Sequence, residues 1–209
     1  MDNNRYDCRM DDNRVIFSGQ GNEKIGIEVG GYKGDGIIQF ANSGINIIHC
    51  FEPVKEFYDE CVTVAQKFKG QLDVKIINKA LWIEEGEKEC ILDDDGSSFF
   101  IDGNKKETIN TITLLKYMEE NKIDYIDYIR FNCEGAEFAL LRYILDNNLD
   151  EKIGTIIIQY HPHLKDKIPH YEDIDSQLGE FEKRGFKQEP YIPRVIAFKR
   201  KKDALGRPL

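Results

Sequence analysis

Short apolar runs alternate with amphipathic segments along most of this 209-residue chain. Apolar runs of this length are typical of buried strands, and the sequence predicts strands at 24–30, 45–53, 73–82, 127–135 and 154–162. Apolar residues spaced three or four apart predict helices at 34–44, 54–70, 111–121, 136–148 and 171–185. This alternation predicts an α/β fold with a doubly wound, Rossmann-like and mostly parallel sheet that carries helices on both faces.

Two regions depart from the alternation. Residues 87–110 alternate only loosely and contain polar turns, so they fit either a β excursion or a flexible loop. Segments 186–190 and 194–201 predict two closing strands that pair as an antiparallel edge. The chain therefore divides into a short N-terminal extension (1–24), one domain (25–200) and a basic C-terminal tail (201–209).

Composition narrows the function classes. A net charge of −9 disfavours nucleic acid and anionic membranes as partners, and no apolar run approaches the roughly 18 residues of a membrane span. The polar N-terminus lacks the apolar core of a signal peptide, which predicts a cytoplasmic protein. Five scattered cysteines without a C-x-x-C pair argue against both a disulfide framework and a zinc cluster.

The stretch "IEVGGYKGDG" carries the first candidate chemistry. Glu28 ends the first predicted strand, and Gly30, Gly31 and Gly34 would let the backbone turn sharply against a ligand. Taken alone, these glycines fit a plain strand-to-helix turn equally well. Glu52 ends the second strand 22 residues after Gly30, close to the offset at which an acid reaches ribose hydroxyls, and the pair favours an adenosine-containing ligand.

The charge of these strand ends indicates which adenosine ligand fits. The glycines do not form the G-x-G-x-x-G of a dinucleotide site, and there is no G-x-x-x-x-G-K-[ST] phosphate loop. An acidic strand end repels phosphate and favours a cation. S-adenosylmethionine carries an ammonium and a sulfonium and has no phosphate, so Glu28 near the ammonium and Glu52 on the ribose suit it better than NAD.

Several motifs occur together in the order of one family: "IEVGGYKGDG", "IHCFEP", "INKALW" and "IDYIRFNCEGAE". Over about residues 25–146 the chain resembles FkbM-type methyltransferases, enzymes that use S-adenosylmethionine to methylate hydroxyl oxygens of small molecules or sugars. The resemblance implies a seven-stranded sheet with an antiparallel last strand. It also implies a set of cofactor-binding residues, which in this chain are Glu28, Gly30, Gly31, Gly34, Glu52, Pro53, Asn78, Lys79, Ala80 and Asn132.

The chain departs from the family pattern at three acids. Glu28 replaces an aspartate, which is a mild change. Asn132 replaces the aspartate before the glutamate–glycine pair, and Thr113 replaces the aspartate of a Thr-Leu-Asp motif. An amide cannot act as a base or balance a cation, so the loss at Asn132 favours a changed mechanism or weak activity.

Methylation of a hydroxyl requires removal of its proton, and the sequence offers two candidate catalytic residues. The resemblance puts Glu134, with Glu137, next to the reacting methyl group, whereas capping of the turn at Gly135 is the alternative role for Glu134. His161 follows a buried strand and is a candidate base, with an ordinary loop position as its alternative. The loop "HPHLKDKIPH" lacks the i, i+4 spacing of a helical metal site, so we expect no metal.

Other side chains have two open interpretations. Residues 93–100, "DDDGSSFF", fit either a lid over the cofactor or a solvated acidic loop. Five aromatic residues fit either the pocket wall or the core: Tyr32, Trp82, Phe99, Phe100 and Tyr160.

Methyl transfer to a small-molecule or glycan hydroxyl is the leading function. A non-catalytic S-adenosylmethionine- or nucleoside-binding module and an NAD-dependent oxidoreductase remain as alternatives.

Overall fold

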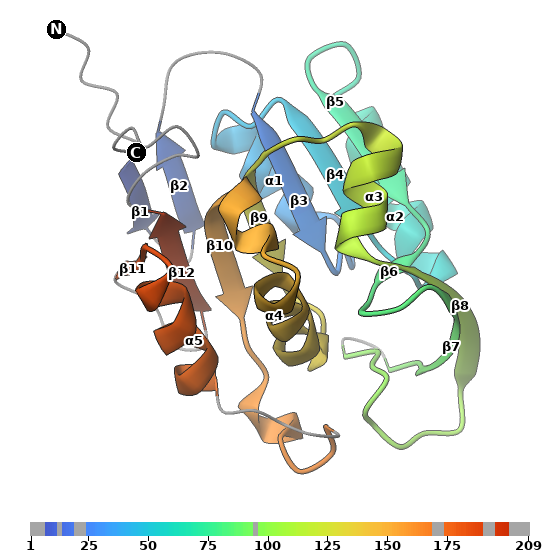
Figure 1. The fold of residues 1–209 in the computed structure, drawn as a ribbon. Helices are drawn as coiled ribbons and strands as arrows, with labels where there is room; N and C mark the ends of the chain where they lie inside the picture. Colours follow the sequence, from blue (N-terminus) through green and yellow to red (C-terminus); the bar gives the residue numbers. More distant parts are fainter. Residues whose placement is uncertain are drawn as a thin grey trace, which may run out of the picture.

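A seven-stranded sheet forms the centre of the computed structural model, which describes residues 7–11, 14–18, 24–93, 96–168, 174–189 and 195–200 (Figure 1). The strand order is β11-β12-β10-β9-β3-β4-β5. Their bounds are β3 Ile25–Val29, β4 Ile47–Phe51, β5 Asp73–Ile77, β9 Ile126–Phe131, β10 Ile153–Gln159, β11 Phe186–Glu189 and β12 Val195–Arg200. The strands from β10 to β5 pair in parallel, and β12 is antiparallel to both of its neighbours, which confirms the predicted fold class.

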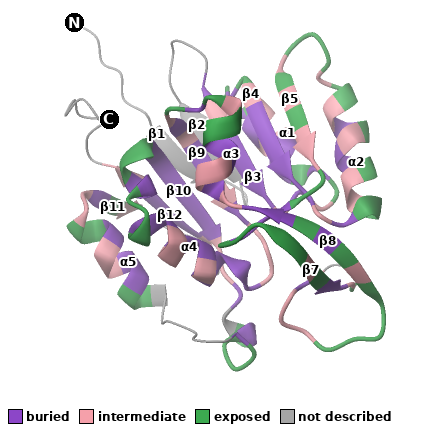
Figure 2. Ribbon diagram, turned by 45° about the vertical axis from the view of Figure 1, so that its right-hand side comes forward, coloured by how far each residue is buried: buried purple, intermediate pink, exposed green. Residues whose placement is uncertain are grey.

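Within the described residues, five α-helices cover the two faces of this sheet: α1 Asp35–Asn42, α2 Lys55–Gln66, α3 Leu114–Asn121, α4 Ala136–Asp146 and α5 Ile174–Lys183. Figure 1 shows α3, α4 and α5 in front of the sheet and α1 and α2 behind it. Side chains of β10 alternate between the two cores: Ile156 and Ile158 pack with the first helix set, and Ile157 packs with the second. Burial on both faces explains why this strand reads as an unbroken apolar run (Figure 2).

A second, three-stranded sheet replaces two of the predicted elements. It consists of β6 Ala80–Leu81, β7 Gly86–Ile91 and β8 Lys106–Ile112, in the order β6-β8-β7. The prediction of one strand over 73–82 is therefore wrong in its second half, because the chain leaves the main sheet after β5. Of the two interpretations of 87–110, the β excursion is confirmed, with β7 and β8 pairing antiparallel.

The predicted helix at 111–121 begins later than expected, because β8 extends to Ile112. Thr113 is the N-cap of α3, and its side chain accepts a hydrogen bond from the backbone N–H of Lys116 at 3.2 Å. Threonine and aspartate both serve as N-caps. The replacement of the family's aspartate by Thr113 therefore preserves the start of this helix.

The remaining described elements are short. In the N-terminal segment, β1 Asp7–Asp11 and β2 Arg14–Ser18 pair antiparallel, apart from the main sheet. Two 3-10 helices, η1 Leu149–Lys152 and η2 Pro162–Leu164, flank β10. The basic tail 201–209 and His170 lie outside the described residues.

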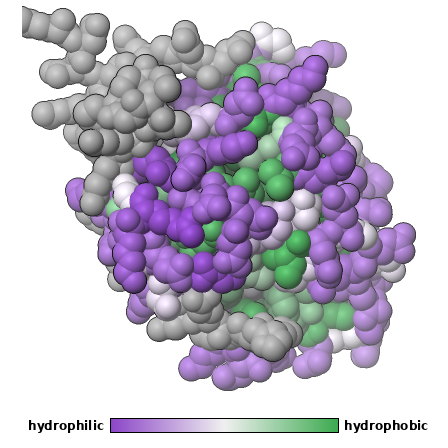
Figure 3. All heavy atoms as spheres, viewed as in Figure 1, coloured by the Kyte–Doolittle hydropathy of each residue, from purple (hydrophilic) through white to green (hydrophobic). Residues whose placement is uncertain are grey.

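The surface seen in Figure 3 is hydrophilic over most of its area, with hydrophobic residues gathered toward its middle. Ile83 is the single large hydrophobic residue that is exposed in the described part of the chain. None of the helices described there combines the length and the apolar character that crossing a membrane requires.

Gly30 sits where three strand ends meet. Its N–H donates to the carbonyl of Phe51 at 3.0 Å, and the N–H of Asn132 donates to the carbonyl of Val29 at 2.9 Å. Gly30 has a φ of +91°, and a Cβ added to it would lie 1.9 Å from the carbonyl oxygen of Asn132. Only glycine fits this crossing of two backbones.

Gly30→Ala should therefore lower the free energy of unfolding by much more than an alanine substitution does at a left-handed glycine that has open space around it. Gly44 is the matched control, because its φ is +77° and a Cβ there would meet no atom within 4 Å. We expect Gly44→Ala to cost about 1 kcal/mol, and Gly30→Ala to cost about 3 kcal/mol or more, since its clash is with backbone. Urea unfolding measures both, and equal costs would contradict the close approach.

Candidate active site

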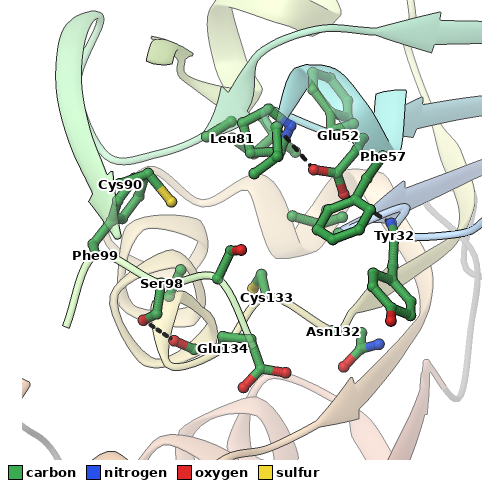
Figure 4. Close-up of a pocket in the computed structure, with 18 residues that line it drawn as sticks. Tyr32, Glu52, Phe57, Leu81, Cys90, Ser98, Phe99, Asn132, Cys133 and Glu134 are labelled. Carbon is green, nitrogen blue, oxygen red and sulfur yellow. Dashed lines mark hydrogen bonds between the residues drawn. The ribbon is translucent and has the colours of Figure 1, made fainter. Parts of the chain in front are cut away.

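A pocket lies at the carboxyl ends of β3, β4 and β9, where ligands bind in open α/β sheets (Figure 4). The small sheet and the loop after β7 supply its other walls. The lining residues are Val29, Gly30, Tyr32, Phe51, Glu52, Pro53, Val54, Phe57, Ala80, Leu81, Cys90, Ser97, Ser98, Phe99, Asn132, Cys133, Glu134 and Ala136.

The charge of this lining is one-sided. Glu52 and Glu134 are the only acidic or basic residues among the described residues that line the pocket, and no Lys, Arg or His is among them. Burial raises the pKa of the Cys90 thiol to about 12 and that of Cys133 well above its usual value, so both thiols are neutral. A lining of this kind favours a ligand that carries positive charge and disfavours one that carries phosphate.

Glu52 holds two turns together from within the pocket. The backbone N–H of Tyr32 donates to its Oε2 at 2.8 Å, and the N–H of Val54 donates to its Oε1 at 2.9 Å. Burial raises the pKa of Glu52 to about 7, against the opposing effect of these backbone hydrogen bonds. Each carboxylate oxygen can accept a second hydrogen bond, so Glu52 can also bind a pair of hydroxyl donors.

Asn132 brings an acceptor without a partner to the same site. It lines the pocket, and its Oδ1 is buried with no hydrogen-bond partner in the part of the chain that the structure describes. A buried acceptor in this state is costly unless something donates to it. A ligand with an N–H or ammonium group next to Asn132 would supply the donor.

Glu134 lies on the turn from β9 into α4. Glu134 and Gly135 both have a left-handed backbone, with φ of 47° and 97°. Oε1 of Glu134 lies 3.0 Å from Nε2 of His161, and Nδ1 of His161 lies 3.0 Å from Oε1 of Glu137. Burial alone would lower the pKa of His161, but its hydrogen bonds with Glu134 and Glu137, together with their charges, raise it to about 9.

The loop after β7 covers this turn. The hydroxyl of Ser98 donates to the backbone carbonyl of Glu134 at 2.7 Å, and Ser97, Ser98 and Phe99 line the pocket (Figure 4). Phe99 packs edge-on against Trp82, with ring centroids 5.2 Å apart. For residues 96–100 these contacts favour the lid over the solvated loop, whereas Asp94 and Asp95 lie outside the described residues.

The structure gathers six of the predicted site residues around the pocket: Gly30, Glu52, Pro53, Ala80, Asn132 and Glu134. Six others do not line it: Glu28, Gly31, Gly34, Asn78, Lys79 and His161.

Glu28 is the clearest correction, because its side chain lies beneath α1 and not toward the pocket. It is buried, and a Cβ added to Gly36 would lie 2.3 Å from the Glu28 carboxyl carbon. Nη1 of Arg130 lies 3.6 Å from its Oε1. Glu28 therefore does not line the pocket, and its carboxyl group lies beside Arg130 under the glycine turn.

Gly31, Gly34 and Asn78 do not line the pocket, but each helps to shape the segments that do. Gly31 leaves room for the buried Cys50 and Cys61, and Gly34 leaves room for Val64 of α2. The side chain of Asn78 donates to the carbonyls of Glu52 and Pro53 at 3.0 and 2.9 Å. It thus fixes the strand end that carries Glu52.

Lys79 and His161 fail to line the pocket for different reasons. Lys79 is exposed, whereas His161 is buried behind Glu134. Among the described residues, no group of three or more His, Cys, Asp or Glu is arranged to hold a metal ion.

Several lining residues had no signal in the sequence analysis. Phe57, Leu81 and Cys90 reach the pocket from α2, β6 and β7, and nothing local distinguishes them from core residues. Tyr32 and Phe99 do line the pocket, as one of the two interpretations of the aromatic residues expected. The other aromatic candidates, Trp82, Phe100 and Tyr160, pack with the larger core.

Comparison with known proteins identifies one family and several distant structures. The family described as "Methyltransferase FkbM domain" matches residues 28–187, which is most of the chain. No match was found among curated proteins.

Three solved structures illustrate the structural comparison. A human methyltransferase 10 domain containing protein is 10% identical with a TM-score of 0.48, covering 86% of this chain and 72% of that chain. An rRNA methylase from Streptococcus thermophilus is 11% identical with a TM-score of 0.47, covering 85% and 87%. TrmK of M. capricolum, solved with S-adenosyl-homocysteine, is 13% identical with a TM-score of 0.44, covering 87% and 64%.

The buried acid beneath α1 should make stability depend on pH. Burial raises the pKa of Glu28 from 4.5 to about 7, against the effect of Arg130. The folded state thus binds this proton more tightly than the unfolded state. The stability that Glu28 contributes is complete below pH 4.5 and is lost as the pH rises through about 7.

Glu28→Gln should remove this loss, because the amide resembles the protonated acid. The free energy of unfolding of the variant, relative to the unaltered protein, should rise by on the order of 2 kcal/mol between pH 5 and pH 8. Denaturant titrations at several pH values measure it. Glu85→Gln, at an exposed position, is the control, and parallel curves for Glu28→Gln and the unaltered protein would contradict the assignment.

Proposed function

This chain belongs to the FkbM methyltransferase family, and we propose that it transfers the methyl group of S-adenosylmethionine to a hydroxyl oxygen of a small molecule or sugar. The observation that carries the proposal is the pocket at the ends of β3, β4 and β9, where Glu52 and Glu134 are the only charged side chains among the described lining residues. The site lies where the family's glycine turn, strand-end acid and glutamate–glycine turn converge.

The residues present fit this cofactor. Glu52 would accept a hydrogen bond from the ribose hydroxyls, because a carboxylate has more acceptor positions than its backbone partners occupy. Ala80 and Leu81 offer an apolar wall for the adenine. Asn132 and the bare backbone of Gly30 would lie beside the methionine part, where Oδ1 of Asn132 needs a donor.

When bound, S-adenosylmethionine supplies an electrophilic methyl group on a sulfonium. The protein's task is to align the acceptor oxygen with that group in a dry pocket, which is worth about 7–11 kcal/mol in favourable systems. Glu134 is the side chain that we assign to take the hydroxyl proton. It lines the pocket with its side chain 22% exposed, and a base in such a position contributes about 10²–10⁴-fold.

Neither alternative function fits the site as well. A pyrophosphate in this pocket would lie beside two glutamates with no basic side chain among the described lining residues to balance its charge, which counts against an NAD-dependent oxidoreductase. The loss of two family acids, at Asn132 and Thr113, would favour the non-catalytic module. Since Thr113 caps α3, only Asn132 still favours that reading.

Partners and location remain predictions. The acidic lining and the net charge of −9 support a small-molecule or glycan acceptor over a nucleic acid. We keep the cytoplasm as the expected location from the sequence.

Ligand titration separates these functions. We expect S-adenosylhomocysteine to bind at micromolar concentration and NAD at least about 100-fold more weakly, because the lining repels a pyrophosphate. Isothermal titration calorimetry of the full chain measures both. A preference for NAD would overturn the methyl-donor assignment.

A second assay decides between an enzyme and a binding module. Release of S-adenosylhomocysteine should be followed with a panel of sugars and small hydroxylated compounds. Tight binding without turnover on any of them would favour the module.

Removing the charge of Glu52 should weaken cofactor binding. We expect Glu52→Gln to lower the affinity for S-adenosylhomocysteine by about tenfold or more, since hydrogen bonds to a charged group are lost. Glu56→Gln, at an exposed position on α2, is the matched control.

The affinity for S-adenosylhomocysteine should also depend on pH, because burial raises the pKa of Glu52 to about 7. The affinity of the unaltered protein should rise between pH 6 and 8 as Glu52 ionises, and this rise should be smaller in Glu52→Gln. Equal isotherms for the two proteins would remove Glu52 from the site.

A further inference from the structure

Behind the pocket, Glu134, His161 and Glu137 form a continuous chain of polar contacts, which we call the carboxylate–imidazole array. His161 lies in the middle, with Nε2 3.0 Å from Oε1 of Glu134 and Nδ1 3.0 Å from Oε1 of Glu137. Only Glu134 lines the pocket, and the other two residues are buried.

The array is anchored to the backbone at its inner end. Oε1 of Glu137 accepts the backbone N–H of His161 at 2.8 Å, and its Oε2 accepts the N–H of Gly135 at 2.9 Å. Glu137 is fully buried. It therefore joins the segment after β10 to the turn before α4, and it fixes both the imidazole and the residue that follows Glu134.

The geometry of the array bears on the protonation state of His161. A carboxylate accepts hydrogen bonds and donates none, and each nitrogen of His161 faces a carboxylate oxygen. A neutral imidazole would turn one lone pair toward a carboxylate at 3.0 Å. With both carboxylates ionised, both contacts are hydrogen bonds only if both nitrogens carry hydrogen, and the geometry then requires His161 to be an imidazolium.

The surroundings agree with this protonation state. The pKa of His161 is raised to about 9 by the two glutamates, despite the burial that would lower it. The other titratable ring nearby is that of His163, whose centroid lies 5.9 Å from that of His161. An imidazolium with both N–H groups engaged has no lone pair for a substrate proton, so His161 is not the base.

We propose that His161 and Glu137 are positioning residues that orient the Glu134 carboxylate, and that Glu134 accepts the proton of the acceptor hydroxyl during methyl transfer. The proposal rests on the proposed function. In the step, the acceptor O–H bond breaks and its proton passes to Glu134, while the oxygen bonds to the methyl carbon. The carbon–sulfur bond breaks, and its electron pair stays on the sulfur of S-adenosylhomocysteine.

The charges of the array suit this step. Glu134 and Glu137 lie on opposite sides of the His161 ring, so the array combines two carboxylates with one imidazolium. The array carries one net negative charge before the proton arrives and is neutral afterwards, so the transfer leaves no new buried charge.

Nitrogen-15 NMR of the histidine rings tests the array without any acceptor. At pH 7.5 we expect one ring of the full chain, assigned by its loss in His161→Gln, to show both nitrogens protonated. In Glu137→Gln that ring should lose a proton, whereas Glu182→Gln, at an exposed position on α5, should leave it unchanged. A neutral His161 ring in the unaltered protein would overturn the proposal, even if that protein methylates an acceptor.

Kinetics with an acceptor found in the panel test the positioning role. His161→Gln keeps an N–H donor for Glu134, and His161→Leu removes it. We expect His161→Leu to lower kcat at least about tenfold more than His161→Gln does, with the dissociation constant of S-adenosylhomocysteine within about threefold of the unaltered value. Equal kcat values for both variants would overturn the positioning role. Failure of the proposed function would show itself separately, as an unaltered protein that turns over no acceptor.

Discussion

Backbone N–H groups at the ends of parallel strands need acceptors, and in this fold two buried carboxylates supply them. Glu52 accepts from Tyr32 and Val54, and Glu137 accepts from Gly135 and His161. Each carboxylate therefore joins segments that lie far apart in the sequence. Because an unpaired buried N–H costs about 1–3 kcal/mol, the strand-end turns depend on these acids for their shape, and the pocket between the turns depends on them in the same way.

The negative charge of the pocket follows in part from this structural role, because Glu52 both accepts the backbone hydrogen bonds and lines the pocket. An acid that ties two turns together keeps free lone pairs, and burial raises the pKa of Glu52 to about 7. Its ionised form is therefore stabilised most by a ligand that brings hydroxyl donors or positive charge. Structural support and ligand selection are combined in one side chain.

The sequence predicted the order of strands and helices well, because each main strand is an apolar run buried on both faces. The same reasoning failed after Ile77, because it extended the strand to residue 82 whereas β5 ends at Ile77. There the side chain of Asn78 donates to the carbonyl of Glu52, just after β4, and the chain leaves the main sheet. Glu52 and Gly30 line the pocket as the strand-end reasoning expected, and Asn132 lines it as the resemblance implied. Glu28 also ends a strand, but its side chain lies under α1, where the missing Cβ of Gly36 leaves room for its carboxyl group. Leu81 and Cys90 belong to the small sheet, and no local pattern indicates where such a sheet docks.

Asn132 shows how the departure from the family pattern and the array are linked. An aspartate at this position would give the pocket a third acid, directly before Cys133 and two residues before Glu134. The amide removes that charge. Glu134 is then the one carboxylate of this turn that lines the pocket, and it contacts His161, which lies behind the pocket. The chain thereby concentrates its capacity to accept a proton on one side chain. That side chain is held by an imidazolium whose other nitrogen faces a fully buried glutamate, so its orientation is set by the core and not by solvent.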